Sequence, residues 1–363
     1  MIKMKRKNKM NDKSILEIDG SMGEGGGAIL RLSAGLSVVF NQPIRVYNIR
    51  ANRSKPGLRL QHLLGLKNLA KLTNSSLSEC EVGTKEIIFK PTATSLKEKL
   101  DIGVSTAASI GLLLQPIQIA CLGFEHPDQV IINLHGGGTL GKWAPGLNYL
   151  KNVTYQIFKK HGFEITIDIH KYGFYPKGGG ATTCKIEPPK KGLNPINLTS
   201  LGNLDVIEGK IVCSNKLSNA RVSERIKESA EAALKREISI STHIEYEYVN
   251  SLSVGVGISL WAKSDTGAII SSGTVLGERH ISSEQLGRNA VNKILAYIQN
   301  DIPVDNYLSD QLLPFMAFTN SASKIKVAEV TSHARTNLEL IKMFAHRDFA
   351  IENSENYSII KIN

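Results

Sequence analysis

Apolar positions along the chain change between strand-like and helix-like spacing, and they do so in an order that recurs. Short or alternating apolar runs predict strands, and apolar residues three and four apart predict helices. The first set of predicted elements comprises strands at 15–19, 43–49, 77–82 and 86–90 and helices at 28–39 and 58–72. Their order along the chain is βαβαββ.

This order occurs a second time in full and a third time in part. The second copy has strands at 100–104, 130–134, 163–170 and 180–186, helices at 105–120 and 143–160, and a turn at 136–138. The third copy has helices at 308–318 and 337–344, a strand at 325–330 and a hairpin at 349–352 and 357–362, but no pattern places its first strand. Such repetition indicates duplicated units that pack sheets against helices.

A different pattern separates the second and third copies. It opens with the linker-like run PPKKG and continues with a strand at 206–213, a charged helix at 219–236, strands within 239–270 and a helix at 282–298. We therefore predict an α/β (α+β) fold in which three repeated βαβαββ units form a core domain, residues 14–186 and 303–363. A smaller inserted α/β domain spans residues 187–302.

The charge of the chain indicates which kind of partner it binds. The net charge is +11, which favours a polyanion such as nucleic acid or a nucleotide. Part of this charge lies in residues 1–13, which we predict to be a disordered basic tail. An RNA-binding arm and a solvated end without a role both fit this tail.

Cysteine usage and hydropathy exclude several classes of protein. The four cysteines are far apart and show no CxxC spacing, which argues against a zinc site and a dense disulfide framework. The longest apolar stretch, residues 107–122, is interrupted by Gln115, Pro116 and Gln118, so it does not suit a membrane span. We expect a cytoplasmic protein without a membrane role.

The first candidate for chemistry is the turn GEGGG at residues 23–27, between a predicted strand and helix. Glycines there let backbone N–H groups approach an anion at the start of a helix. Glu24 would repel a phosphate unless a divalent cation lies between them. A plain tight turn is the alternative.

The second candidate is a basic cluster with Arg50, Arg53 and Lys55 after a predicted strand. Ligands of open α/β sheets lie at that end of the strands, and arginine is suited to phosphate oxygens. Arg31 and Gln61, in the first two helices, could face the same place. A solvated basic loop is the alternative.

The third candidate is His333, which follows a strand and precedes a helix. Thr336 and Glu339 have capping-box spacing, which predicts a helix start at about Asn337. The positive end of a helix disfavours an imidazolium, and a neutral imidazole is required for attack on phosphorus. Asp310 and Gln311, at the start of another helix, could bind a nucleotide or a metal, or only complement the helix dipole.

These segments together resemble the RNA 3′-terminal phosphate cyclase family. The similar pieces, in order over residues 18–337, are IDGSMGEGGGAILR, IRANRSKPGLRLQH, GLLLQP, HGGGTLGKWAP, GFYPKGGG, YLSDQLLP and TSHARTN. Each piece alone is modest, but the ordered set is specific. The resemblance implies three βαβαββ units with an inserted domain, as the pattern predicts. It also implies an enzyme of the ligase class that uses ATP to convert an RNA 3′-phosphate into a 2′,3′-cyclic phosphodiester.

The resemblance further implies a role for each matching residue. His333 would be the nucleophile that carries AMP, with an RNA–ppA end as the next intermediate, and Glu24 would bind Mg²⁺ or Mn²⁺. Arg31, Arg50, Arg53 and Gln61 would lie around the phosphates. The ATP-binding positions would be Gln115, Tyr307, Leu308, Ser309, Asp310 and Gln311. The implied partner is RNA with a 3′-phosphate end, with no role for DNA and with oligomer formation left open.

The chain departs from the family's pattern at two places. Leu140 stands where many relatives have an aspartate, and Val254 stands where a proline is common. Both put local nucleotide or RNA contacts in doubt. One alternative is a non-catalytic, cyclase-like RNA-binding protein of ribosome assembly, although that branch lacks the nucleophilic histidine. A second is a phosphoenolpyruvate-dependent transferase built from similar repeated units.

Overall fold

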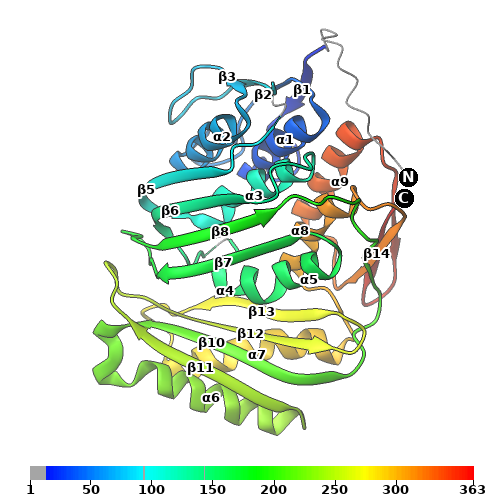
Figure 1. The fold of residues 1–363 in the computed structure, drawn as a ribbon. Coiled ribbons are helices and arrows are strands. Elements are labelled where there is room, and N and C mark those ends of the chain that lie inside the picture. The colour runs from blue at the N-terminus through cyan, green and yellow to red at the C-terminus, as the bar shows by residue number, and fades with distance from the viewer. Residues whose placement is uncertain (1–13, 93–94, 143) are drawn as a thin grey trace.

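The computed structural model describes residues 14–92, 95–142 and 144–363 and has the predicted mixed α/β fold (Figure 1). The predicted tail, residues 1–13, and Trp143 lie outside the described residues. Within that range the strands form four sheets of four strands each. None of the described helices is both long and apolar enough to cross a membrane.

The first two units have the same pairing pattern. The first comprises β1 (Leu16–Asp19), α1 (Gly27–Phe40), β2 (Ile44–Tyr47), α2 (Leu60–Thr73), β3 (Ser76–Leu77) and β4 (Ile87–Lys90). The second comprises β5 (Lys99–Ser109), α3 (Ile110–Cys121), β6 (Val130–Gly138), α4 (Leu147–Tyr149), η1 (Leu150–Thr154), α5 (Tyr155–Lys160), β7 (Glu164–Lys171) and β8 (Ala181–Glu187). In each sheet the first two strands are parallel, and the remaining pairs are antiparallel.

The third unit contains the strand that the sequence pattern leaves unplaced. It comprises β9 (Asn197–Leu198), α8 (Asn306–Met316), β14 (Ser323–Val327), α9 (Ser332–Ala345), β15 (Phe349–Asn353) and β16 (Ser358–Ile362). β9 pairs with β14 in parallel, and its two residues lie within the range predicted for the insert. The sheet order β9-β14-β16-β15 repeats that of the other two units, so the unit is complete.

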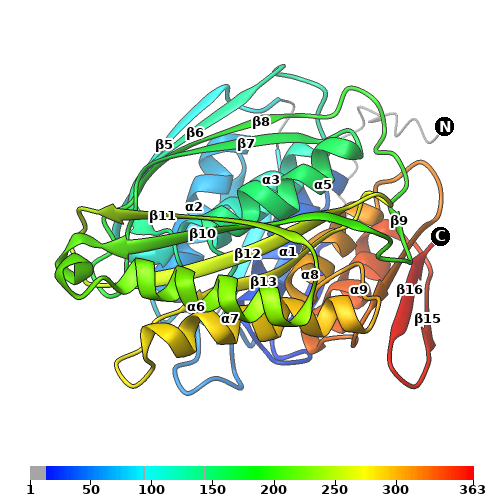
Figure 2. The ribbon, with the colours of Figure 1, turned by 90° about the horizontal axis from the view of Figure 1, so that it is seen from below.

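The insert forms the fourth sheet. It comprises β10 (Leu204–Ser214), η2 (Asn215–Ala220), α6 (Val222–Glu237), β11 (Ser241–Val249), β12 (Val256–Ser264), β13 (Ile269–Leu276) and α7 (Ser283–Gln299). Its strand order is β11-β10-β12-β13, and α6 and α7 cover one face (Figure 2). These elements agree closely with the strands and helices predicted between 206 and 298.

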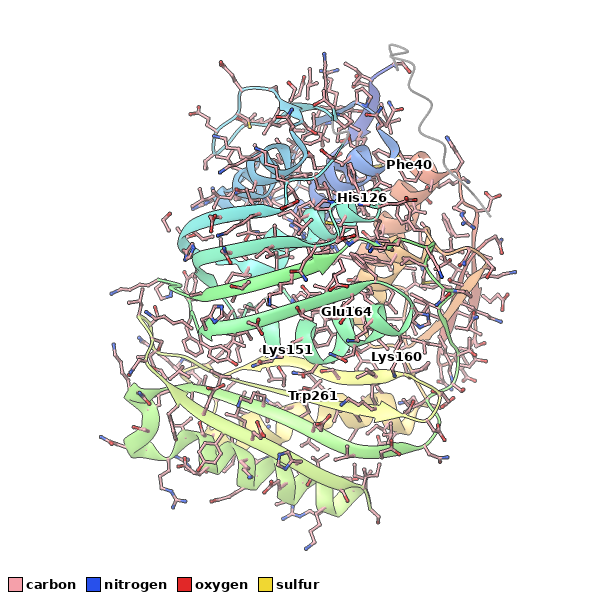
Figure 3. The ribbon with its side chains drawn as sticks, viewed as in Figure 1. Phe40, His126, Lys151, Lys160, Glu164 and Trp261 are labelled. Atoms are coloured by element: carbon pink, nitrogen blue, oxygen red, sulfur yellow. The ribbon has the colours of Figure 1, made fainter. Side chains whose placement is uncertain are left out.

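Helices from all three units pack together in the middle of the core, and the sheets lie outside them (Figure 1). α1 contacts both α3 and α9. Phe40, labelled in Figure 3, is the last residue of α1, and its ring lies 6.3 Å from that of Phe344 in the last turn of α9. At the other end, a Cβ on Gly26, just before α1, would lie 4.0 Å from His333 Cε1 in the first turn of α9. The two helices therefore run in the same direction.

The insert is joined to the second unit along a seam. Lys160 Nζ, at the end of α5, donates to the Gly267 carbonyl oxygen at 3.1 Å (Figure 3). Leu140, one of the two departures from the family pattern, is buried in the seam with Tyr172, Phe174 and Val212. A leucine at this position therefore packs the insert against the core.

Several predicted element boundaries are wrong. The strand predicted at 77–82 is present only as β3, which ends at Leu77. The stretch 105–109 continues β5, although the pairing with β6 shifts register after Val104 and resumes at Ser109. α3 begins only after Ser109, whose hydroxyl accepts from the Leu112 N–H. The glycines 136–138 are the end of β6 rather than a turn. The predicted long helix at 143–160 begins at Leu147 and contains a π-helical segment.

Candidate active site

A glycine turn, residues 23–27, connects β1 to α1 and contacts the third unit. Gly23 and Gly25 have φ of +54° and +57°, a backbone conformation that favours glycine. A Cβ added to Gly23 would lie 2.3 Å from Thr336 Oγ1 of α9. α1 begins after Gly26 and has no acidic residue in its first turn. Its N-terminal N–H groups are therefore not complemented by a carboxylate of their own helix.

His333 lies in the first turn of α9, because this helix starts earlier than predicted. Thr331 caps it by accepting from the Ala334 N–H at 2.9 Å, and Thr336 Oγ1 donates to the Ser332 carbonyl oxygen instead of capping. His333 Nε2 lies 3.4 Å from Glu24 Oε2. The imidazole therefore stands between the start of α9 and the glycine turn.

Glu24 is held by side chains from two other segments. Ser332 Oγ donates to Glu24 Oε1, and Arg53 Nη2 donates to Glu24 Oε2 at 3.0 Å. The hydrogen bond from Ser332 is the main reason why the pKa of Glu24 is below its usual range. Glu24 is therefore a carboxylate at neutral pH, next to the candidate nucleophile.

Arg50 and Arg53, which the sequence places in one basic cluster, make different contacts. Arg53 is exposed, and its Nη2 would lie 3.2 Å from a Cβ on Gly26. Arg50 Nη1 donates to the carbonyl oxygens of Lys55 and Gly57, at 2.6 and 3.0 Å. Burial, followed by the charges of Arg59 and Arg53, lowers the pKa of Arg50. Arg53 thus faces the turn, and Arg50 braces the basic loop.

Arg31 of α1 and His62 of α2 lie beside Gly27, at the start of α1. Arg31 Nε donates to Gln115 Oε1 at 2.8 Å, and burial lowers the pKa of Arg31 to about 10, so it remains charged at neutral pH. A Cβ on Gly27 would lie 2.2 Å from His62 Nε2 and 2.8 Å from Arg31 Nη1. The structure thus brings the predicted pair Arg31 and Gln115 together at the turn.

His62 is a site residue that the sequence analysis missed. It is 3% exposed, and its Nδ1 accepts from the Arg59 N–H at 3.1 Å. Burial, followed by the charges of Arg31, Arg50 and Arg59, lowers the pKa of His62 to about 3. The ring is therefore neutral. Gln61, which was predicted, lies beside it, with Nε2 3.5 Å from His62 Nε2.

The predicted run 307–311 divides into exposed and buried side chains. Tyr307 is 38% exposed and packs edge-on against Tyr149, with ring centroids 6.1 Å apart. Leu308 and Ser309 are fully buried, so their side chains face the interior. Gln311 Oε1 accepts from Thr154 Oγ1 at 3.1 Å. A nucleotide at this helix would thus meet Tyr307, Asp310 or Gln311 side chains.

Asp310 connects this run to the helix of His333. Its Oδ1 accepts from Thr331 Oγ1 at 2.6 Å, and its carbonyl oxygen accepts from Asn337 Nδ2 at 2.8 Å. Burial raises the pKa of Asp310 to about 7, and the nearby Asp305 and Glu24 carboxylates add to the rise. Asp310 therefore fixes the capping residue of α9.

The residues at the turn fit a divalent cation only together with a substrate. No group of three or more histidine, cysteine, aspartate or glutamate side chains in the described part of the chain could hold a metal. Glu24 supplies one carboxylate beside the uncomplemented start of α1. Mg²⁺ is commonly held by one or two carboxylates together with substrate phosphates and water, and Glu24 would be one such carboxylate.

Comparison with known proteins identifies the family. A family model described as RNA 3′-terminal phosphate cyclase matches residues 22–351. The chain belongs to the RNA 3′-terminal phosphate cyclase family. The match spans the glycine turn, the basic loop, the 307–311 run and His333, so the resemblance seen in the motifs is confirmed, and the chain is an enzyme of this family.

Individual members of the cyclase family support this assignment. A protein named RNA 3′-terminal phosphate cyclase from Methanopyrus kandleri is 34% identical, and the alignment covers 94% of this chain and 96% of the relative. Its namesake from Thermococcus kodakarensis is 36% identical, with 93% and 94% covered. The solved enolpyruvyl transferase NikO from Streptomyces tendae is 9% identical, and its TM-score of 0.20 supports no statement about this fold.

Proposed function

We propose that this chain cyclises the 3′-terminal phosphate of RNA at the expense of ATP, with AMP carried on His333. The observation that supports this most directly is the position of the imidazole. His333 Nε2 lies 3.4 Å from Glu24 Oε2 and beside the glycine turn, where phosphate would meet the start of α1. Named relatives that align over nearly the whole chain support the same reaction class.

In the first proposed step, the lone pair of His333 Nε2 attacks the α-phosphorus of ATP. A P–N bond forms, the bond from the α-phosphorus to the bridging oxygen breaks, and pyrophosphate leaves with the bonding electrons. Arg53, beside Gly26, and Arg31, beside Gly27, would neutralise the charge that builds up on the phosphates.

Glu24 would hold a divalent cation against the phosphates in this arrangement. Mg²⁺ or Mn²⁺ bound there would supply charge neutralisation of the triphosphate. The side chains of Ser332 and Arg53 orient Glu24, and they keep its carboxylate next to His333. Tyr307, Asp310 and Gln311 are the residues of the run that we assign to ATP.

In the second proposed step the RNA 3′-phosphate is activated by adenylylation, and in the third it is converted into the cyclic phosphodiester. An oxygen of the RNA 3′-phosphate attacks the phosphorus of the histidine-bound AMP, the P–N bond breaks, and an RNA–ppA end forms. The neighbouring 2′-oxygen then attacks the RNA phosphorus, its proton is released, and AMP leaves. A phosphate monoester has no good leaving group, so adenylylation provides one, and the vicinal hydroxyl reacts intramolecularly.

Protein labelling tests the proposal. We expect α-labelled ATP with Mg²⁺ or Mn²⁺ to transfer label to the intact protein through an acid-labile P–N bond, and the label to be absent from His333→Ala. His135→Ala is the matched control, since His135 is exposed on β6 and lies outside the site. An intact protein that takes no label with either metal refutes the mechanism, and label persisting in His333→Ala refutes the nucleophile.

A further inference from the structure

One exposed corner of the molecule has the composition of a nucleic-acid-binding surface and lies outside the site described above. The loop 172–180 joins β7 to β8, and the loop 250–255 joins β11 to β12. Tyr175 in the first loop is 81% exposed, and Leu252 and Val254 in the second are 50% and 51% exposed. Large apolar side chains grouped at the surface commonly mark a site of interaction.

The two loops hold each other in place across the seam. The Lys177 N–H donates to Ser253 Oγ at 3.1 Å. A Cβ on Gly179 would lie 2.6 Å from Leu252 Cδ1, so the leucine packs directly on the first loop. We call Tyr175, Lys177, Leu252 and Val254 the loop platform. Because these contacts hold the two loops together within the chain itself, the platform is formed before any partner binds.

The charge next to Tyr175 favours a single RNA strand over an apolar protein partner. Lys171 and Lys177 flank the tyrosine in sequence and are exposed, and neither forms an ion pair with a described residue. An exposed aromatic ring stacks on bases of any identity, while nearby lysines neutralise the phosphates. The net charge of +11 acts in the same direction.

The platform is connected to the predicted ATP-binding run by successive contacts. The connection passes from α8 to β13, then to the segment before α4, and from there to the first loop. The contacts, in order, are the Tyr307 ring against Gly273, Thr274 Oγ1 against Gly146, the Leu147 N–H to the Thr139 carbonyl oxygen at 2.9 Å, and the Thr139 N–H to the Gly173 carbonyl oxygen at 2.9 Å. Most of these residues are buried, so the contacts fix the platform relative to the run through the interior of the seam.

We propose that the loop platform binds the bases of the RNA strand upstream of its 3′-phosphate end, with Tyr175 as the stacking residue. The identity of the RNA end rests on the proposed function. Binding at the platform needs no ATP turnover, so it can be measured separately. Labelling of His333 without RNA then reports on the ATP site and on the fold of every variant.

The experiment measures binding of a fluorescent ten-nucleotide RNA ending in a 3′-phosphate, without ATP. Tyr175→Ala is expected to weaken binding about tenfold, and Tyr175→Phe, which keeps the ring, to bind as the parent does. Lys177→Gln should lower the slope of log Kd against log salt by about one. Tyr246→Ala is the control, because Tyr246 is 41% exposed on β11 and packs edge-on with Tyr248. It should bind as the parent does.

The outcomes distinguish an RNA strand from a second copy of the chain as the partner of the platform. Equal affinities for the parent and Tyr175→Ala overturn the proposal, as does equal weakening by Tyr246→Ala. A dimer seen by light scattering and lost in Tyr175→Ala, with RNA affinity unchanged, would assign the platform to a second copy of the chain. Tyrosine-dependent RNA binding by a protein that never labels His333 would support the platform and refute the proposed function.

Discussion

Asp305 offers a test of how the interior around the 307–311 run is built. This carboxyl group has no exposed surface and caps α8. Tyr149 Oη donates to its two oxygens at 2.8 and 3.0 Å, and the Leu308 N–H donates at 3.0 Å. Burial outweighs these hydrogen bonds and raises the pKa of Asp305 from 3.8 to about 7. The folded protein therefore holds a proton there that the unfolded chain releases.

The size and sign of the effect follow from these two pKa values. They are about three pH units apart, and each unit corresponds to about 1.4 kcal/mol, so ionising Asp305 in the folded state costs about 4 kcal/mol. The contribution of this raised pKa to the free energy of unfolding is fully present below pH 3.8. It is lost as the pH rises toward about 7, because the unfolded state binds fewer protons throughout that window.

Replacing Asp305 with asparagine removes this titration while keeping one oxygen as an acceptor. We would measure the free energy of unfolding in urea from pH 5 to pH 8. As the pH rises, the value for Asp305→Asn should increase relative to the value for the parent. The relative change should be about 2 kcal/mol over the two units below pH 7, because about half of the folded-state carboxyl groups are already ionised at pH 7. Asp305 also raises the pKa of Asp310, so the substitution acts in the same direction there.

Asp301→Asn is the matched control for this titration. Although burial opposes it, the hydrogen bond from Lys326 lowers the pKa of Asp301, so this carboxylate stays ionised throughout the window. Its difference from the parent should not change from pH 5 to pH 8. Parallel pH profiles for Asp305→Asn and the parent would refute the reasoning about Asp305.

Three further changes test the site. Thr331→Val removes both the cap of α9 and the hydrogen bond to Asp310, and should lower the free energy of unfolding in urea by at least about 1 kcal/mol, whereas Thr331→Ser should keep it; equal stabilities of Thr331→Val and the parent would show that neither hydrogen bond matters. Gly27→Ala places a Cβ 2.2 Å from His62 Nε2 and should abolish labelling of His333 while circular dichroism stays unchanged, and normal labelling would contradict this packing. Arg50→Ala and Arg53→Ala should both slow labelling or AMP transfer in a folded chain. Only Arg50→Ala should speed proteolysis at 50–57, and normal rates in both would mean that the phosphate site lies elsewhere.

Much of the fold could be predicted because apolar spacing and repetition reinforce each other. The helices of the first two units are long enough to show a period, and a second copy supports the first. β9 could not be found, because two residues carry no period. The end of β5 was missed because Val104-Ser105-Thr106-Ala107-Ala108 is small and weakly polar, and this composition fits either a strand or a helix start.

The site could be predicted as a set of motifs but not as a geometry. The turn, the basic loop and the histidine were identified, yet no local pattern pairs Arg31 with Gln115 or Glu24 with Ser332. His62 follows Gln61 in the motif LRLQH, which was the available signal, but its burial depends on Gly27 from another segment. The start of α9 was misplaced because Thr331 and Thr336 are both acceptable caps, and only packing on Asp310 selects the first.

The third sheet has a consequence for the order in which the protein becomes active. β9 precedes the insert and its partner β14 follows it, so β9 leaves the ribosome long before it can pair. At about 5–20 residues per second, the wait is on the order of ten seconds. Glu24 and Ser332 are hydrogen-bonded although 308 positions separate them. The nucleophile is thus added late, and we expect a chain that ends before His333 to lack the chemistry altogether rather than to perform it poorly.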